Sequence, residues 1–186
     1  YRQRHQDNIV NSLMRLKGSN TPSVLIRVLS DMTASVPVTE TAAAIAEACE
    51  YSEVANALSA RVLNSALSLR DRVSAAYTVC SLNNESAKGR LKSLLPVDPA
   101  QDPQDDLRGL VLRACWPTHL TPSEIVPHLS SPQKTNLFGA YRQFIEYDLP
   151  VSMPAVVETS KDINLLLWAI SRVTENRFSS SLGVLA

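Results

Sequence analysis

Glycine and aromatic residues are both scarce in this sequence. Its 186 residues include only 5 glycines and 5% aromatic residues, whereas glycine alone makes up about 7% of an average protein. So few glycines leave little material for the tight turns of an all-β fold or for loops that cradle phosphate groups. Because 45% of the residues are hydrophobic, we expect a chain that folds, with α-helix as its main element.

Net charge, a cysteine framework and long apolar runs are also missing. The 18 Lys and Arg residues balance the 18 Asp and Glu residues, so the basic excess of a typical nucleic-acid-binding protein is absent. The three cysteines, Cys49, Cys80 and Cys115, are widely spaced and fit reduced cytosolic thiols better than disulfides. No apolar run approaches the ~18 residues of a membrane-spanning helix, and no signal peptide is recognisable. We therefore expect a cytoplasmic protein that binds neither nucleic acid nor membrane.

The sequence contains no recognisable catalytic or nucleotide-binding motif. The fragment Ala87-Lys88-Gly89-Arg90 comes nearest to a phosphate-binding loop, but it lacks the first glycine and the Ser or Thr of that motif. The zinc-protease pattern His-Glu-x-x-His and the hydrolase pattern Gly-x-Ser-x-Gly are absent too. We therefore predict no catalytic residue, no cofactor site and no metal site in this stretch, and we do not expect it to be an enzyme.

The sequence does contain an apolar quartet at positions i, i+3, i+4 and i+7, which predicts one buried face of a helix. The quartet recurs as Leu25/Val28/Leu29/Met32, Ala42/Ile45/Ala46/Cys49, Val73/Ala76/Tyr77/Cys80, Leu107/Leu110/Val111/Ala114, Leu137/Ala140/Tyr141/Phe144 and Ile163/Leu166/Leu167/Ile170. Successive helices begin about 15–20 residues apart, so a pair of helices occupies about 35 residues, the size of an α-solenoid repeat. The pattern predicts an all-α fold, a HEAT-like right-handed α-solenoid of about ten helices. We expect it to form a single domain over residues 1–186, with 175–186 as a disordered tail.

Prolines and cap residues predict where two of these helices begin. Asp102-Pro103 and Thr121-Pro122 each place a capping side chain before a proline at the first helical position. Glu124 completes a capping box with Thr121, and Pro127 predicts that the helix after Thr121 is short or broken.

Gly109 and Gly139 both fall inside predicted helices, where glycine costs about 1 kcal/mol relative to alanine. Two explanations stay open for each position. Either a neighbouring backbone comes too close for a side chain, or the glycine is a neutral substitution at a tolerant surface position.

Cys115 and His119, with His128 as a further candidate ligand, are the strongest candidates for a metal or nucleophile site. Zinc requires three or four ligands within about 2.3 Å of the ion, and Pro117 interrupts the helix between Cys115 and His119. We therefore favour a buried thiol at a helix end and a solvent-facing histidine. Asp106 lies in an acidic cluster at a predicted helix N-terminus, where the helix dipole stabilises negative charge.

Residues 105–121 resemble a known family. The segment reads Asp-Asp-Leu-Arg-Gly and then Ala-Cys-Trp-Pro-Thr-His-Leu-Thr, and similar blocks occur in the helical-repeat regions of prokaryotic NACHT/STAND NTPases. The string Trp116-Pro117-Thr118-His119-Leu120 is the most specific part, and residues 129–132 and 136–144 resemble the continuation of the block. The resemblance covers residues 73–150, whereas residues 1–60 match only in their helical character.

This resemblance implies a role without a reaction. In such proteins an NTPase module drives oligomerisation, and C-terminal helical repeats act as sensor or autoinhibitory surfaces, often in anti-phage defence. The missing nucleotide motifs and the start at Tyr1, without an initiator methionine, lead us to expect a fragment of a larger protein. Its partners would be another protein or other domains of the same chain, bound through exposed side chains near the matched block: Arg108, Arg113, His119 and Arg142.

Two other readings stay open. One is a free-standing scaffold or adaptor solenoid with no NTPase attached. The other is an all-α metal-binding or enzymatic bundle built around Cys115, His119 and Asp106.

Overall fold

The computed structural model describes residues 10–132, 139–160, 163 and 166–171, and these are arranged in helices and loops without a β-strand. The predicted all-α class is therefore confirmed for this part of the chain. The proposed tail at 175–186 lies outside the described residues. The α-helices are α2 (Thr21–Ser30), α3 (Val36–Ala48), α4 (Ala55–Leu63), α5 (Leu69–Ser81), α6 (Glu85–Arg90), α7 (Asp106–Cys115), α8 (Pro122–Ile125), α9 (Ala140–Gln143) and α10 (Leu149–Ser160).

Short helical turns extend several of these helices. The 3₁₀ turns are η1 (Ser52–Val54), η2 (Leu91–Leu94) and η3 (Val126–His128), and the π-helical turn η4 (Phe144–Asp148) joins α9 directly to α10. Residues 10–14 and 166–171 are also helical. Among the described helices, none has both the length and the apolar character needed to cross a membrane.

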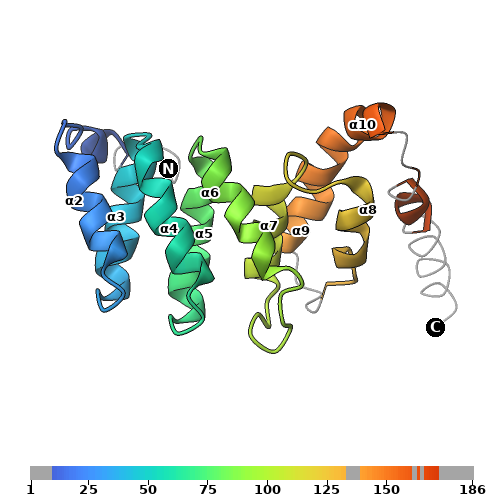
Figure 1. Cartoon of the computed structure of the whole chain (residues 1–186), viewed down its shortest axis with the longest axis horizontal. Helices are drawn as coiled ribbons and strands as arrows, with labels where there is room; N and C mark the ends of the chain where they lie inside the picture. The colour runs from blue at the N-terminus through green and yellow to red at the C-terminus, as the bar shows by residue number, and fades with distance from the viewer. Residues whose placement is uncertain (1–9, 133–138, 161–162, 164–165, 172–186) are drawn as a thin grey trace, which may run out of the picture.

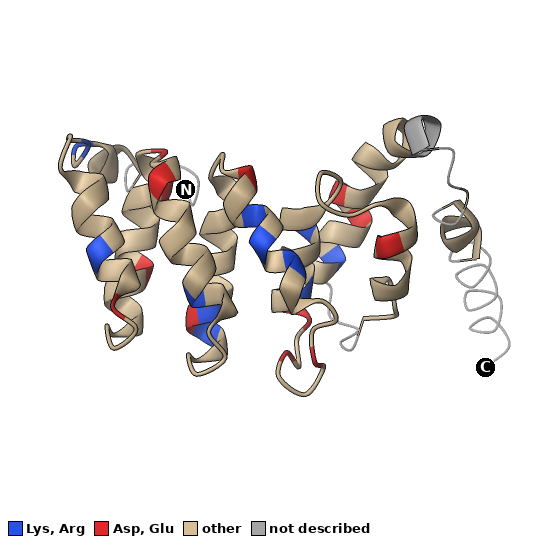
Figure 2. Cartoon of the chain, viewed as in Figure 1, with Lys and Arg blue, Asp and Glu red and all other residues tan. Residues whose placement is uncertain are grey.

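The helices lie side by side in a row (Figure 1). Along one side of the row, α3 packs on α5, α5 on α7, and α7 on α9, while along the other side α2 packs on α4 and α4 on α6. Contacts of α2 with α3, of α4 with α5 and of α6 with α7 hold the two sides together. Acidic and basic residues are interspersed along the row, and basic residues gather around α6 and α7 (Figure 2).

The apolar quartets contribute part of the core between these helices. In α7 all four quartet residues, Leu107, Leu110, Val111 and Ala114, are buried, as the 3.6-residue period predicts. The last quartet behaves differently, because its residues are 40–60% exposed: Ile163, Leu166, Leu167 and Ile170. In the chain as described, this quartet therefore does not form a buried face.

In α5 the predicted face is correct only in part, because Ala76 is buried and Val73 and Cys80 pack against the core while Tyr77 is exposed. The fully buried side of this helix carries Ala75, Ala76 and Val79 together with charged Asp71 and Arg72, whereas Tyr77 of the quartet is 42% exposed. The helix is packed between α3, α4 and α7, and its buried face includes polar contacts that hydrophobic periodicity does not record.

Those polar contacts centre on a buried ion pair between Arg61 of α4 and Asp71 of α5. The guanidinium donates from Nη2 to Asp71 Oδ2 at 2.6 Å and from Nη1 to the carbonyls of Leu29 and Asp31 at 3.0 and 2.9 Å. Thr39 of α3 donates its hydroxyl to Asp71 Oδ1 at 3.2 Å. The ion pair thus links α2, α3, α4 and α5 by hydrogen bonds, and both charges are buried but hydrogen-bonded.

The predicted caps are correct at Thr121 and displaced at Asp102. Thr121 and Glu124 form the capping box of α8, which ends after four residues, as Pro127 predicts. The expected helix start at Asp102-Pro103 is wrong, because α7 begins at Asp106 after a left-handed residue, Asp105, with φ 58°. Asp102 still caps this helix from a distance, since its Oδ2 accepts the Arg108 amide at 2.8 Å.

A side chain is disfavoured at Gly109 by close packing and at Gly139 by backbone conformation. Gly109 lies in the middle of α7 against the backbone of α9, so the close-approach explanation is confirmed there. Gly139 is not inside a helix: it precedes α9 with φ 155°, a conformation that other residues rarely adopt.

Candidate functional site

Arg108, in the first turn of α7, is the most highly connected of the predicted contact residues. Its guanidinium donates to Asp105 Oδ1 at 3.2 Å, to Ser130 Oγ at 2.7 Å, to the His128 carbonyl and to Tyr141 Oη at 2.9 Å. The guanidinium carbon also lies 3.8 Å from the centre of the Tyr141 ring, a cation–π contact. A planar group with five N–H donors is suited to joining several chain segments at once.

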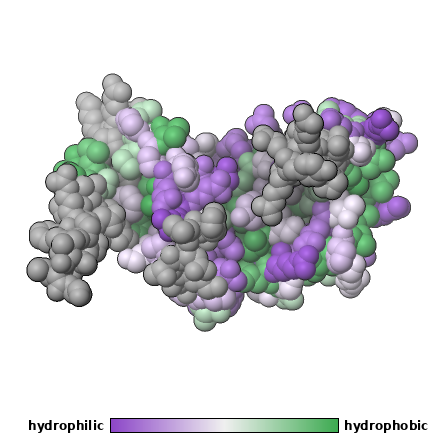
Figure 3. Space-filling model, turned by 180° about the vertical axis from the view of Figure 1, so that it is seen from behind, coloured by the Kyte–Doolittle hydropathy of each residue, from purple (hydrophilic) through white to green (hydrophobic). Residues whose placement is uncertain are grey.

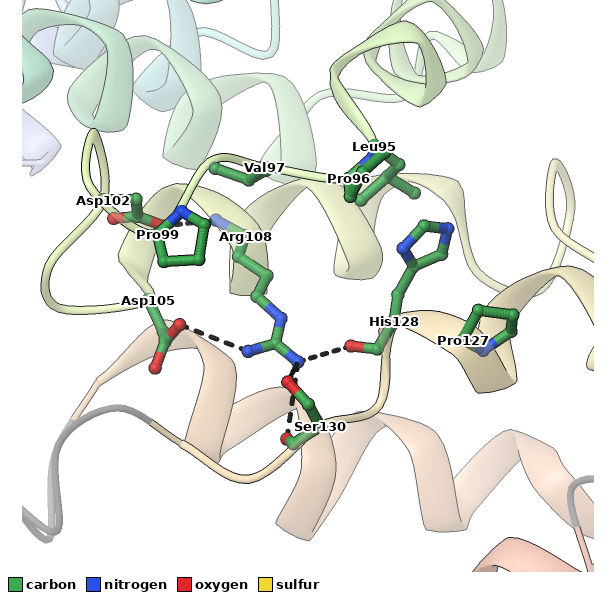
Figure 4. A pocket seen from close by; sticks show the side chains of 10 residues that line it. All are labelled: Leu95, Pro96, Val97, Pro99, Asp102, Asp105, Arg108, Pro127, His128 and Ser130. Carbon is green, nitrogen blue, oxygen red and sulfur yellow. Dashed lines mark hydrogen bonds and ion pairs between the residues drawn. The ribbon is translucent and has the colours of Figure 1, made fainter.

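The prediction that Arg108 is an exposed contact residue is therefore wrong. Only 11% of its side chain is exposed, because the loop around residues 128–130 returns over the first turn of α7 and accepts its hydrogen bonds (Figure 4). The residue positions the loops of this chain, and its guanidinium points inward.

A small cavity of about 190 Å³ adjoins Arg108 (Figure 4). Burial raises the pKa of the Asp102 carboxyl, although the amides of Arg108 and Leu107 donate to it. Burial, with the Arg108 charge beside it, lowers the pKa of His128, so its imidazole is held neutral. The wall is completed by apolar side chains and a serine: Leu95, Pro96, Val97, Pro99, Pro127 and Ser130. Arg108 is hydrogen-bonded to Asp105 and Ser130 of the same lining, and we assign the cavity a structural role.

Arg113 and Arg142 lie at the surface but are each paired. The side chain of Arg113 is 38% exposed and meets Asp148 Oδ2 at 3.4 Å, which ties α7 to η4. Arg142 pairs with Glu146 four residues later. Because both pairs are partly exposed, each is worth little to stability, and both guanidinium groups can exchange partners at low cost.

His119 and Cys115 are engaged separately from each other. The His119 imidazole meets Glu85 Oε2 at 3.2 Å and also lines a hollow of about 470 Å³ between the α7–α8 loop and α10. Cys115 Sγ lies 3.5 Å from the Lys88 carbonyl, and burial raises the pKa of its thiol to about 12. Asp106 accepts the Ala140 amide at 3.0 Å. Within the described ranges no group of three or more His, Cys, Asp or Glu residues could hold a metal ion, so nothing favours the metal-binding reading.

The largest hollow near these elements, about 560 Å³, was not foreseen from the sequence. It is an open groove across α3 and α5 that ends at the start of α7. One wall is the outer face of α3, with Glu40, Ala43, Ala44 and Glu47 at helical spacing, and the other includes Val73 and Tyr77 of α5. The sequence signal for it was the second face of α3, where two alanines lie between two glutamates.

The four predicted contact residues do not meet in one place. Arg108 lies at the small cavity, His119 at the hollow beside α10, and Arg113 and Arg142 on the surface near η4. Comparison with models of known protein families, with curated proteins and with solved structures finds no match to this chain. The functional assignment consequently depends on the geometry of the chain and on the resemblance of residues 73–150.

Proposed function

We propose that this chain is a non-catalytic helical-repeat module that recognises another protein or other domains of its own chain, built as a HEAT-like right-handed α-solenoid. The thiols of Cys80 and Cys115 are poor nucleophiles, because burial raises the pKa of each to about 12. The groove across α3 and α5 is open and extended, which suits a polypeptide better than a small substrate.

The spacing of contacts between neighbouring helices is the observation that supports the repeat arrangement. Arg61 donates to the carbonyl of Leu29, 32 residues earlier, and Asn84 donates to that of Ser52, also 32 residues earlier. Stacked repeats of about 35 residues produce contacts of this kind, one helix pair apart along the chain. Further pairs are Cys80–Leu110 (30 residues apart), Tyr51–Gly18 (33), Arg108–Tyr141 (33) and Ala140–Asp106 (34).

The resemblance of residues 73–150 to the repeat regions of NACHT/STAND NTPases supports a more specific role. We propose that the module senses a partner, or holds the NTPase inactive, within a larger cytoplasmic protein of bacterial defence. A scaffold or adaptor without an NTPase is the competing proposal. The two differ in the open reading frame that carries this sequence: a nucleotide-binding motif in that frame favours the first, and its absence favours the second.

The test is deletion of residues 1–186 from the full-length protein, followed by measurement of NTPase activity and oligomerisation in cells infected with phage. Loss of the response, with nucleotide binding preserved, is the expected result. An intact response after the deletion would overturn the sensor role and leave the module as a passive spacer.

A further inference from the structure

In the groove across α3 and α5, small side chains line the α3 wall and larger apolar side chains line the α5 wall. Ala43 and Ala44 keep the α3 side shallow because their side chains end at Cβ, and they lie between Glu40 and Glu47 on one face of the helix. On the α5 side, Tyr77 exposes 42% of its surface beside Val73. Apolar side chains that hydrophobic periodicity assigns to the core thus face an open hollow instead. Seen from behind, the molecule shows apolar surface between hydrophilic ridges (Figure 3).

The charge of the groove is acidic. Its lining carries three carboxylates, Glu40, Glu47 and Asp106, and one guanidinium, that of Arg70. Arg70 is occupied by Glu40, with two parallel hydrogen bonds of 2.8 and 2.9 Å. In the part of the chain that the structure describes, Glu47 and Asp106 have no cationic partner. Arg113, which interacts electrostatically with Tyr77, is itself paired with Asp148.

We propose that this groove binds a polypeptide segment that carries a lysine or arginine next to a bulky apolar side chain. The cation would pair with Glu47, and Asp106 would add negative charge at the α7 end of the groove. The apolar side chain would lie on the alanines of α3 against Val73 and Tyr77. Two carboxylates without a cationic partner repel phosphate, which disfavours nucleic acid as the occupant and favours a basic peptide. The apolar wall supplies the desolvated contact that an ion pair at an open surface does not provide by itself.

This inference rests on the proposed function, since it names the surface and the partner chemistry of the same recognition module. Its test starts from short random peptides displayed on phage and selected against the purified chain of residues 1–186. Enriched peptides are then synthesised with a fluorescent label, and their dissociation constants are measured by fluorescence anisotropy. We expect the selected peptides to combine Lys or Arg with Leu, Ile, Phe or Trp.

Two groove variants and two matched surface variants identify the binding site. Glu47→Lys and Tyr77→Ala should each weaken binding by about tenfold or more, because each removes one half of the proposed recognition. The same changes outside the groove, Glu53→Lys and Tyr147→Ala, should leave the dissociation constant within about twofold. All four residues are exposed, so the fold should survive, and circular dichroism with a thermal melt checks that it does.

Failure of peptide binding in the groove and failure of the proposed recognition function give different experimental results. Peptides that bind equally well to all four variants, or that are acidic, would contradict the proposal that the groove binds a basic segment. They would leave the proposed recognition module in place. A selection that enriches no peptide would also contradict the proposed binding of a peptide in the groove. The deletion experiment on the full-length protein judges the proposed function independently of either result. Weakening confined to the two groove variants, together with wild-type binding that becomes weaker as salt is added, supports the inference because salt screens an exposed ion pair.

Discussion

Gly109 of α7 lies so close to Tyr141 of α9 that a Cβ atom at position 109 would stand 2.1 Å from the Tyr141 amide nitrogen. The contact is between two backbones, so neither side can rotate away. It fixes the distance between α7 and α9 at its minimum and brings Tyr141 under the guanidinium of Arg108, the residue before the glycine.

Gly109→Ala should therefore destabilise the fold although it improves helix propensity. The gain from propensity is about 1 kcal/mol, whereas overpacking costs about 1–3 kcal/mol and occasionally more. Because the obstacle here is backbone, we expect a net loss of stability in urea unfolding. Gly89→Ala is the control, since its Cβ would meet only the His119 side chain, at 3.0 Å. Equal effects of the two substitutions would show that the α7–α9 contact is looser than described.

Leu110→Ala should leave a cavity in the same helix. Leu110 is completely buried, and truncation of a buried leucine costs about 2–5 kcal/mol. Arg113→Ala, three residues later, removes only a partly exposed ion pair and should cost less than about 1 kcal/mol. Urea melts of the two variants measure the difference, and similar losses at both positions would contradict the assigned faces of α7.

Asp71→Asn should be among the most damaging single substitutions. It leaves the charge of Arg61 buried without its counter-ion, which costs about 3–5 kcal/mol in comparable sites. Glu40→Gln breaks a pair of similar geometry with Arg70, whose side chain is 73% exposed, and should change stability much less, because solvent screens the pair. Chemical denaturation of both variants provides the comparison. A small effect of Asp71→Asn would mean that the carbonyls around Arg61 suffice to hold its charge.

His128 should make stability depend on pH. Burial lowers its pKa in the folded state below the ordinary value of 6.5, so the unfolded chain binds a proton more readily than the folded chain. The stability that this neutral imidazole contributes is complete above the unfolded-state pKa and is lost as the pH falls below it. Urea melts between about pH 7.5 and pH 5 should show this decline, and His128→Gln should reduce its slope. An unchanged slope in the variant would assign the pH dependence to another group.

Local patterns in the sequence predicted several features at residue level. The face of α7, the capping box of Thr121 and Glu124, and the short helix α8 each depend on residues a few positions apart. Periodicity and cap chemistry describe interactions within one turn or one helix, and that is the range over which they were correct.

The errors concern contacts between segments distant in the chain. Arg108 was predicted to be exposed, but the loop that buries it lies 20 residues further on. The exposure of Tyr77 could not be recognised, because the buried face of α5 includes charged Asp71 and Arg72, which hydrophobic periodicity does not count. An apolar stripe shows that a helix has a face suited to burial, but it does not identify which neighbour covers that face, or whether one does.

In α2 to α10 the main contacts join helices one or two places apart in the chain. A displacement at one end of the row can therefore reach the other end only if each interface in between shifts in turn. A change of tilt between α3 and α5 would pass first to α7 and then, through the backbone contact of Gly109 with Tyr141, to α9. The backbones of α7 and α9 are already in close contact there, so we expect these two helices to move together as one unit.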